Sequence, residues 1–146
     1  MAPPAVYYLD TSALVKRYLS ESGSAFVSQL FGSQRKPGTF FASALTYVEM
    51  VAAFTRRVPQ APESALQQFV LDWRGFRKVP VDADIISRGA ALAQLHRLRA
   101  ADAIQLASAL RLAASLPGIS LLTSDAEMLL AAKAEGLQVD NPNLYR

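Results

Sequence analysis

Cysteine is absent from this chain of 146 residues, and histidine occurs once, at position 96. Without cysteine there is no disulfide framework, no thiol nucleophile and no Cys-ligated zinc. A single histidine also excludes two-His metal centres and two-His acid–base schemes. We therefore expect His96 at a surface or subunit contact, and we exclude the class of disulfide-stapled secreted domains.

Charged residues are scarce as well, at 18% of the chain against about 25% in an ordinary soluble domain. Even so, the longest uncharged runs, Ser22–Gln34 and Leu112–Ser124, span only 13 residues, whereas a membrane helix needs about 18. The first residues lack the basic and apolar regions of a signal peptide. Because 51% of the residues are hydrophobic and the net charge is only +3, intrinsic disorder is excluded. We expect a cytoplasmic protein without a membrane segment.

The length fits one domain, since about 150 residues usually form one, and no Pro/Gly-rich stretch is long enough to be a linker. We predict a single domain over residues 1–146 in which strands alternate with helices. Predicted strands are Val6–Leu9, Thr39–Ala42, Lys78–Val81, Ile119–Leu122 and Leu137–Val139. Predicted helices run from Thr11 to about Leu19, Ser24–Phe31, Ala44–Arg57, Glu63 to about Phe76, Asp82 to about Leu95, Ala101–Ala114, and from Asp125 onward. Short apolar strands between helices are typical of a parallel sheet covered on both faces.

Four acidic residues stand out by their positions in this pattern. Asp10 and Asp125 follow predicted apolar strands, Asp102 lies in the first turn of a helix, and Glu49 stands beside an apolar helix face. Ligands of open α/β sheets bind at the carboxyl ends of the strands. Each Asp also has a purely structural interpretation, as a helix cap or a first-turn acid. For Glu49 that interpretation is weaker, because an unpaired acid on an apolar face is costly.

The four acids gain meaning only if the fold brings them together. Two carboxylates about 5 Å apart repel by about 3 kcal/mol at an effective dielectric constant of 20. Their pKa values would then rise by about two units unless a cation compensates. A cluster of carboxylates and hydroxyls suits the hard ions Mg²⁺ and Mn²⁺ better than zinc. Sequence spacing alone does not establish this proximity.

Four segments of the chain resemble the motifs of one family. They are YLDTSALVKRY from Tyr8, SALTYVE from Ser43, LRAADAIQLA from Leu98 and LTSD from Leu122, the last followed by Ala132 and the ending Gly136–Pro142. Together they resemble the PIN-domain ribonucleases, especially the VapC-type toxins. The resemblance spans nearly the whole chain, with all four acids in order, and each motif alone is only moderately specific.

The resemblance implies a PIN-like three-layer α/β/α sandwich with a central, mostly parallel twisted sheet. It implies metal-dependent endonucleolytic cleavage of RNA, with Asp10, Glu49, Asp102 and Asp125 as the catalytic acids around one or two Mg²⁺ or Mn²⁺ ions. A VapB-type antitoxin partner and a homodimer are the further family expectations. Nearby hydroxyls are candidate helpers of the acids: Thr11, Ser12 and Thr123.

Basic residues fit an RNA substrate, and eleven of the fifteen are arginines. Arg97 and Arg99 directly precede Asp102, so we predict that they contact RNA phosphates. The doublets at positions 16–17, 35–36 and 56–57 are individually more typical of solvated faces. Trp73 is expected in the core or at an interface rather than as a platform for bases.

Other classes of protein fit less well. A haloacid-dehalogenase-like phosphatase would need a second Asp where Ser12 stands. The glycine patterns of phosphate-loop and dinucleotide-binding folds are missing, as is the Gly-x-Ser-x-Gly elbow of serine hydrolases. Two alternatives stay open: a PIN-like RNA- or protein-binding module without activity, and a PIN nuclease of RNA maturation.

Overall fold

A computed structural model describes residues 6–32, 40–57 and 61–145. Five strands form one sheet in the order β3-β2-β1-β4-β5, and every neighbouring pair is parallel. The strands are β1 (Val6–Leu9), β2 (Phe40–Ser43), β3 (Arg77–Val79), β4 (Ile119–Leu122) and β5 (Gln138–Asp140). The predicted parallel sheet is therefore confirmed, with β1 at its centre.

Seven α-helices and one short 3₁₀ helix connect the strands within the described ranges, and a second 3₁₀ helix follows the last strand. The α-helices are α1 (Thr11–Leu14), α2 (Ser24–Gly32), α3 (Leu45–Arg56), α4 (Glu63–Trp73), α5 (Ala83–His96), α6 (Ala100–Ser115) and α7 (Ala126–Ala134). The 3₁₀ helices are η1 (Val15–Arg17) and η2 (Pro142–Leu144). None of the described helices combines the length and the apolar character that crossing a membrane requires.

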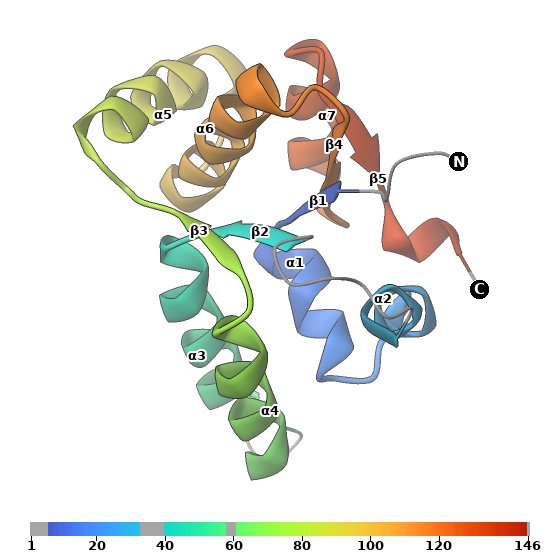
Figure 1. Ribbon diagram of the computed structural model, residues 1–146. Coiled ribbons are helices and arrows are strands. Elements are labelled where there is room, and N and C mark those ends of the chain that lie inside the picture. Colours follow the sequence, from blue (N-terminus) through green and yellow to red (C-terminus); the bar gives the residue numbers. More distant parts are fainter. Residues whose placement is uncertain (1–5, 33–39, 58–60, 146) are drawn as a thin grey trace.

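Successive residues of a strand point to opposite faces of a sheet, and β1 supplies the core on both sides. Tyr8 packs with buried residues of α5, α6 and α7, whereas Leu9 packs with those of α1 to α4. Figure 1 shows these two groups of helices on either side of the sheet. The result is the three-layer sandwich that the resemblance implies.

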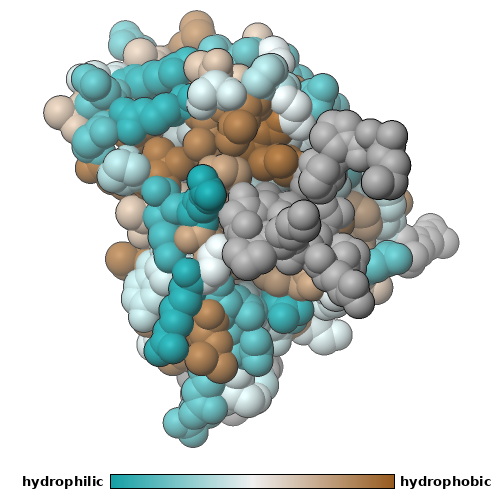
Figure 2. All heavy atoms as spheres, in the orientation of Figure 1, coloured by the Kyte–Doolittle hydropathy of each residue, from teal (hydrophilic) through white to brown (hydrophobic). Residues whose placement is uncertain are grey.

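Three details of the predicted elements are corrected. The helix after Asp10 does not continue regularly to Leu19, because α1 ends at Leu14 and the tighter η1 follows. Phe76 lies beyond the end of α4, in the turn before β3, although it is buried in the same cluster as Phe69. Leu95 shares the helical period of α5 but is 69% exposed, because α5 turns only one side toward α6. Hydrophilic side chains cover much of the visible face of α5 (Figure 2).

Candidate active site

All four acids lie beyond the carboxyl ends of the three adjacent strands β2, β1 and β4, or on a helix packed beside them. Asp10 directly follows β1, and Asp125 comes three residues after the end of β4. Glu49 lies one turn into α3, which follows β2, and Asp102 lies in the first turn of α6. Because parallel strands end at one edge of the sheet, the topology gathers residues that are far apart in the sequence.

Asp10 is the most deeply buried of the four, with 3% of its surface exposed. Its Oδ2 accepts hydrogen bonds from the hydroxyls of Ser12 and Thr123, each at 2.8 Å. Burial raises the pKa of Asp10 above its ordinary value, and the negative charge of Glu49 adds to this, while the two hydroxyls oppose it. Two of the predicted hydroxyl helpers, Ser12 and Thr123, therefore contact Asp10.

Glu49 is half-buried, and its Oε1 accepts two hydrogen bonds. Thr11 donates one from its hydroxyl at 2.9 Å, which places the third predicted helper on this acid. The side-chain amide of Gln105 donates the other at 2.7 Å. Sequence reasoning missed Gln105, although a signal existed: it stands three residues after Asp102, on the same side of a largely apolar helix.

Asp102 shows that the four acids share one electrostatic environment. Its pKa is raised to about 6, chiefly by burial and then by the charges of Asp10, Asp125 and Glu49, in that order. The positive charge of Arg99 acts in the opposite direction. A group of like charges thus disfavours the ionised form of Asp102, as Coulomb's law requires for neighbouring carboxylates.

Asp125 combines the two interpretations that the sequence left open. Its Oδ1 accepts a hydrogen bond from the backbone amide of Met128 at 2.9 Å, so it caps α7. Its charge also reaches Asp102. Structural capping and membership of the acidic group are therefore compatible in one side chain.

The acids of the group differ from the other acids in their partners. Among the described residues, the ion pairs engage a separate set of acids: Glu21, Asp72, Asp82 and Glu135. Within the same part of the chain, no three acidic or histidine side chains already converge as the ligands of a metal ion. The site is thus a set of carboxylates with hydroxyls beside them. Burial and the charges of the neighbouring acids raise the pKa of Asp102, and a hard divalent cation would relieve the repulsion among the carboxylates. This donor chemistry fits Mg²⁺ or Mn²⁺.

The two candidate phosphate-binding arginines lie on either side of buried Leu98, and both are exposed. Arg99 occupies the N-cap position of α6, close enough for its charge to act on Asp102. Arg97 ends α5 in the left-handed conformation, with φ at 56°, and lines a surface pocket together with Leu130 of α7. The structure therefore associates Arg99, more than Arg97, with the acids.

Several other basic residues are occupied elsewhere. Lys16 is buried and pairs with Glu21 at 3.0 Å, and Arg57 pairs with the same carboxylate at 2.8 Å. Arg17 pairs with Asp72 at 2.8 Å. The doublet at positions 35–36 lies outside the described residues.

His96, the single histidine, bonds Glu135 through its Nε2 at 2.7 Å. This contact ties the end of α5 to the residue that follows α7. Trp73 is half-buried among the rings of Tyr47, Phe69 and Phe76, which agrees with a role in packing.

Comparisons with known proteins agree with this architecture. The family model described as PIN domain matches residues 7–134. Two curated relatives from Mycobacterium tuberculosis, Ribonuclease VapC45 (strain CDC 1551 / Oshkosh) and Ribonuclease VapC49 (strain ATCC 25618 / H37Rv), are each 35% identical over 142 residues. The alignments cover 93% of this chain and 94% of each relative.

Solved structures share the fold at lower sequence identity. The structure of FitAB bound to an IR36 DNA fragment has a TM-score of 0.70 at 19% identity, covering 97% of this chain and 98% of that one. A toxin–antitoxin complex from Klebsiella pneumoniae has a TM-score of 0.64 at 21% identity, covering 93% and 97%. At these identities the likeness concerns the fold.

Proposed function

Because the chain belongs to the PIN domain family, we propose that it is an endoribonuclease of the VapC type, the toxin of a toxin–antitoxin pair. Two relatives at 35% identity over nearly their whole length carry the name Ribonuclease VapC. The observation that carries the proposal is the gathering of the four acids at one edge of the sheet, where burial and the charges of the other three raise the pKa of Asp102. Such a group of acids is what metal-assisted cleavage of a phosphodiester requires.

The proposal assigns Mg²⁺ or Mn²⁺ to this group of acids. Asp10 and Asp102 would be the first ligands, followed by Asp125, while Glu49 would hold a second ion or orient the attacking water. The bound ion would lower the pKa of a water molecule and neutralise charge on the scissile phosphate. Oxygen ligands from carboxylates are the ones that these ions prefer.

The protein's own residues would prepare the site in three ways. Ser12 and Thr123 hold one oxygen of Asp10 and so fix the direction of its carboxylate. Thr11 donates a hydrogen bond to Oε1 of Glu49. The other carboxylate oxygen of Glu49, Oε2, would accept a hydrogen bond from the attacking water. Arg99, exposed beside Asp102, would attract a phosphate of the RNA toward an edge that is otherwise acidic.

Substitution of the acids tests this function. Asp10→Asn and Asp102→Asn should each abolish Mg²⁺-dependent cleavage of RNA while the circular dichroism spectrum stays that of the wild type. Asp84→Asn is the matched control, because Asp84 is an exposed first-turn acid of another helix. Undiminished cleavage by either site variant would overturn the assignment.

The alternative without activity makes a different prediction for the wild type. A binding module has no need of a divalent ion at these acids, so calorimetric titration with Mn²⁺ should give no heat. The proposed nuclease should bind Mn²⁺ with a heat that Asp10→Asn reduces. A wild type that neither binds Mn²⁺ nor cleaves RNA would favour the binding module.

The partner is proposed from the same family membership. We expect a VapB-type antitoxin, encoded by a small neighbouring gene, to neutralise the enzyme, which would act as a homodimer in the cytoplasm. The test is expression with and without that gene, followed by mapping of the cleaved RNA ends. Growth arrest relieved by the small gene supports a toxin, whereas harmless expression with trimming of one RNA precursor would indicate an RNA-maturation nuclease.

A further inference from the structure

A buried chain of hydrogen bonds connects the hydrophobic core with Glu49. The hydroxyl of Tyr8 donates to Oε1 of Gln105, and the amide nitrogen of Gln105 donates to Oε1 of Glu49 at 2.7 Å. The same nitrogen donates to the hydroxyl of Thr46 at 2.9 Å. Tyr8, Gln105 and Thr46 are all 0% exposed. A long amide side chain with no access to solvent is unusual, so its position requires an explanation.

Two pairs of residues on facing helices create this arrangement. Gln105 lies three residues after Asp102 on α6, and Glu49 lies three residues after Thr46 on α3. Residues three apart project from the same side of a helix. Each helix therefore presents one acid and one neutral polar residue on the same side, and Gln105 spans the space between the helices.

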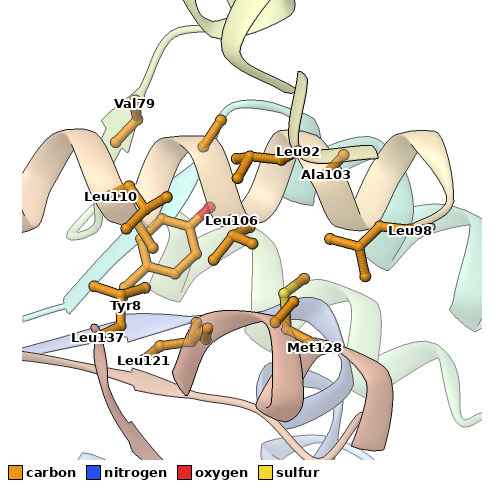
Figure 3. Packing of buried hydrophobic residues seen from close by; sticks show 14 of the residues in the cluster. Tyr8, Val79, Leu92, Leu98, Ala103, Leu106, Leu110, Leu121, Met128 and Leu137 are labelled. Atoms are coloured by element: carbon orange, nitrogen blue, oxygen red, sulfur yellow. The ribbon is translucent and has the colours of Figure 1, made fainter. Parts of the chain in front are cut away.

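The chemistry at both ends of the amide fixes its orientation. An ionised carboxylate can only accept hydrogen bonds, so the NH₂ group of Gln105 must face Glu49. The carbonyl oxygen then faces Tyr8, whose hydroxyl donates to it. Figure 3 shows the ring of Tyr8 directed toward α6, with Leu106 and Leu110 beside it. Because the phenol is enclosed by the core, it holds the amide against flipping.

We propose that Gln105 is a positioning residue for Glu49, held in its orientation by Tyr8. This inference rests on the proposed nuclease function and extends it from the acids to their support. Gln105 would direct the Glu49 carboxylate toward the site through the hydrogen bond that its amide nitrogen donates to Oε1. Partners of this kind typically alter metal affinity or activity by about 10- to 100-fold when they are removed.

The test measures Mn²⁺ affinity by calorimetry on variants whose stability is measured in parallel. Gln105→Met retains the length of the side chain and removes the amide, and it should raise the Kd for Mn²⁺ about 10-fold or more. Tyr8→Phe retains Gln105 and removes only the hydroxyl that orients it, so a smaller rise of about 3-fold is expected. In cleavage assays both variants should lose kcat more than they raise KM, since neither residue contacts RNA in this scheme.

Leu92→Ala is the control for a merely structural role, because Leu92 is a buried residue of α5 in the same core cluster as Tyr8. It should lower the midpoint of urea unfolding and leave the Kd for Mn²⁺ unchanged. Gln105 would be only a core residue if Gln105→Met lowered stability with wild-type Mn²⁺ affinity. If Gln105→Met did not fold, wild-type Mn²⁺ affinity in Tyr8→Phe would overturn the inference.

This experiment also separates the two proposals. If the wild type binds Mn²⁺ and Asp10→Asn does not, but the Gln105 and Tyr8 variants bind it normally, the positioning role fails and the nuclease stands. If the wild type itself shows neither Mn²⁺ binding nor cleavage, the proposed function fails first.

Discussion

Four carboxylates that have similar roles in the sequence pattern occupy four different environments in the fold. Asp10 is buried under two hydroxyls, and Asp125 caps a helix. Glu49 is held by a hydroxyl and an amide, whereas Asp102 is half-buried among the charges of the other three. At the scale of single residues, the environment of Asp102 predicts that its ionisation lowers the stability of the metal-free protein.

Asp102→Asn should stabilise the metal-free protein at pH 8. A folded-state pKa of about 6, raised above the ordinary value of about 3.9, means that ionisation opposes folding. The shift corresponds to about 3 kcal/mol before screening, and about 1 kcal/mol remains for a half-exposed group. Urea denaturation in the presence of EDTA measures this difference in the free energy of unfolding between Asp102→Asn and the wild type. Asp84→Asn is the control, because it loses a comparable first-turn interaction with a helix dipole at a position outside the four acids of the site.

The pH dependence of this difference checks its origin. Above pH 6 both the folded and the unfolded wild type carry the charge, so the destabilisation by Asp102 is fully present. As the pH falls through 6 toward 4, the folded state takes up its proton first, and the wild type gains stability relative to Asp102→Asn. A difference that stayed constant between pH 8 and pH 4 would contradict the electrostatic cause.

At the scale of elements, α6 joins the core to the site. One side of it contributes Ala103, Leu106 and Leu110 to the core cluster, while Asp102 and Gln105 face the acids. Its packing partner α5 is fixed at its start by Asp82, whose Oδ1 accepts from the amide of Ile85 at 3.0 Å. Arg111 of α6 forms two hydrogen bonds with the same carboxylate, at 2.8 and 2.9 Å. One side chain thus caps α5 and ties it to α6.

Asp82→Ala should lower the stability of the protein, and Asp82→Asn should lower it less, because Asn still caps a helix. The hydrogen bonds from Arg111 lower the pKa of Asp82 to about 2. A lowered folded-state pKa stabilises the fold above the ordinary pKa near 3.9, and this stabilisation is lost as the pH falls toward 2. We therefore expect the Tm values of the wild type, Asp82→Ala and Asp82→Asn to differ less at pH 2.5 than at pH 7. Equal differences in Tm at both pH values would mean that the charge of Asp82 contributes nothing to stability.

At the scale of the whole molecule, the distribution of charge matters more than the net value of +3. Setting aside the four acids of the site leaves fifteen basic residues against eight acids. Some of those bases are committed to ion pairs, as Arg17, Arg57 and Arg111 are. Arg99 instead lies exposed beside an acid of the site. An RNA chain that approaches the acids would therefore meet Arg99 on the way.

Arg99→Gln should weaken the binding of single-stranded RNA and lower the slope of log K against log salt concentration by about 0.7, the value for one phosphate contact. Binding is measured in the Asp10→Asn background, so that the RNA stays intact. Arg97→Gln should have a smaller effect, because Arg97 lies toward α7. Arg56→Gln is the control: Arg56 is exposed at the opposite end of α3, seven residues beyond Glu49. Equal effects of Arg99→Gln and Arg56→Gln would indicate a diffuse basic surface.

Much of the fold was predictable because its signals are local. Apolar runs such as Val6–Leu9 and Ile119–Leu122 are strands with the same bounds as predicted, and the helix predicted from Asp82 begins there, with Asp82 as its N-cap. The end of α4 was less predictable, since Phe76 continues the apolar pattern after the helix has ended. Burial of an apolar side chain stabilises the fold in a turn as well as in a helix, so the apolar pattern alone placed the end of α4 too late.

The sequence by itself determined which groups are available: four acids, three hydroxyls near them and an alternation of strands and helices that requires a covered parallel sheet. The tertiary structure alone decided which of these groups share a hydrogen bond or an electrostatic field. Gln105 lies 56 positions from Glu49, and Tyr8 lies 97 positions from Gln105. Contacts over such separations depend on the strand order and on which side of each helix faces the sheet. No local spacing in the chain encodes these contacts, because they form only when the strands assemble on both sides of β1.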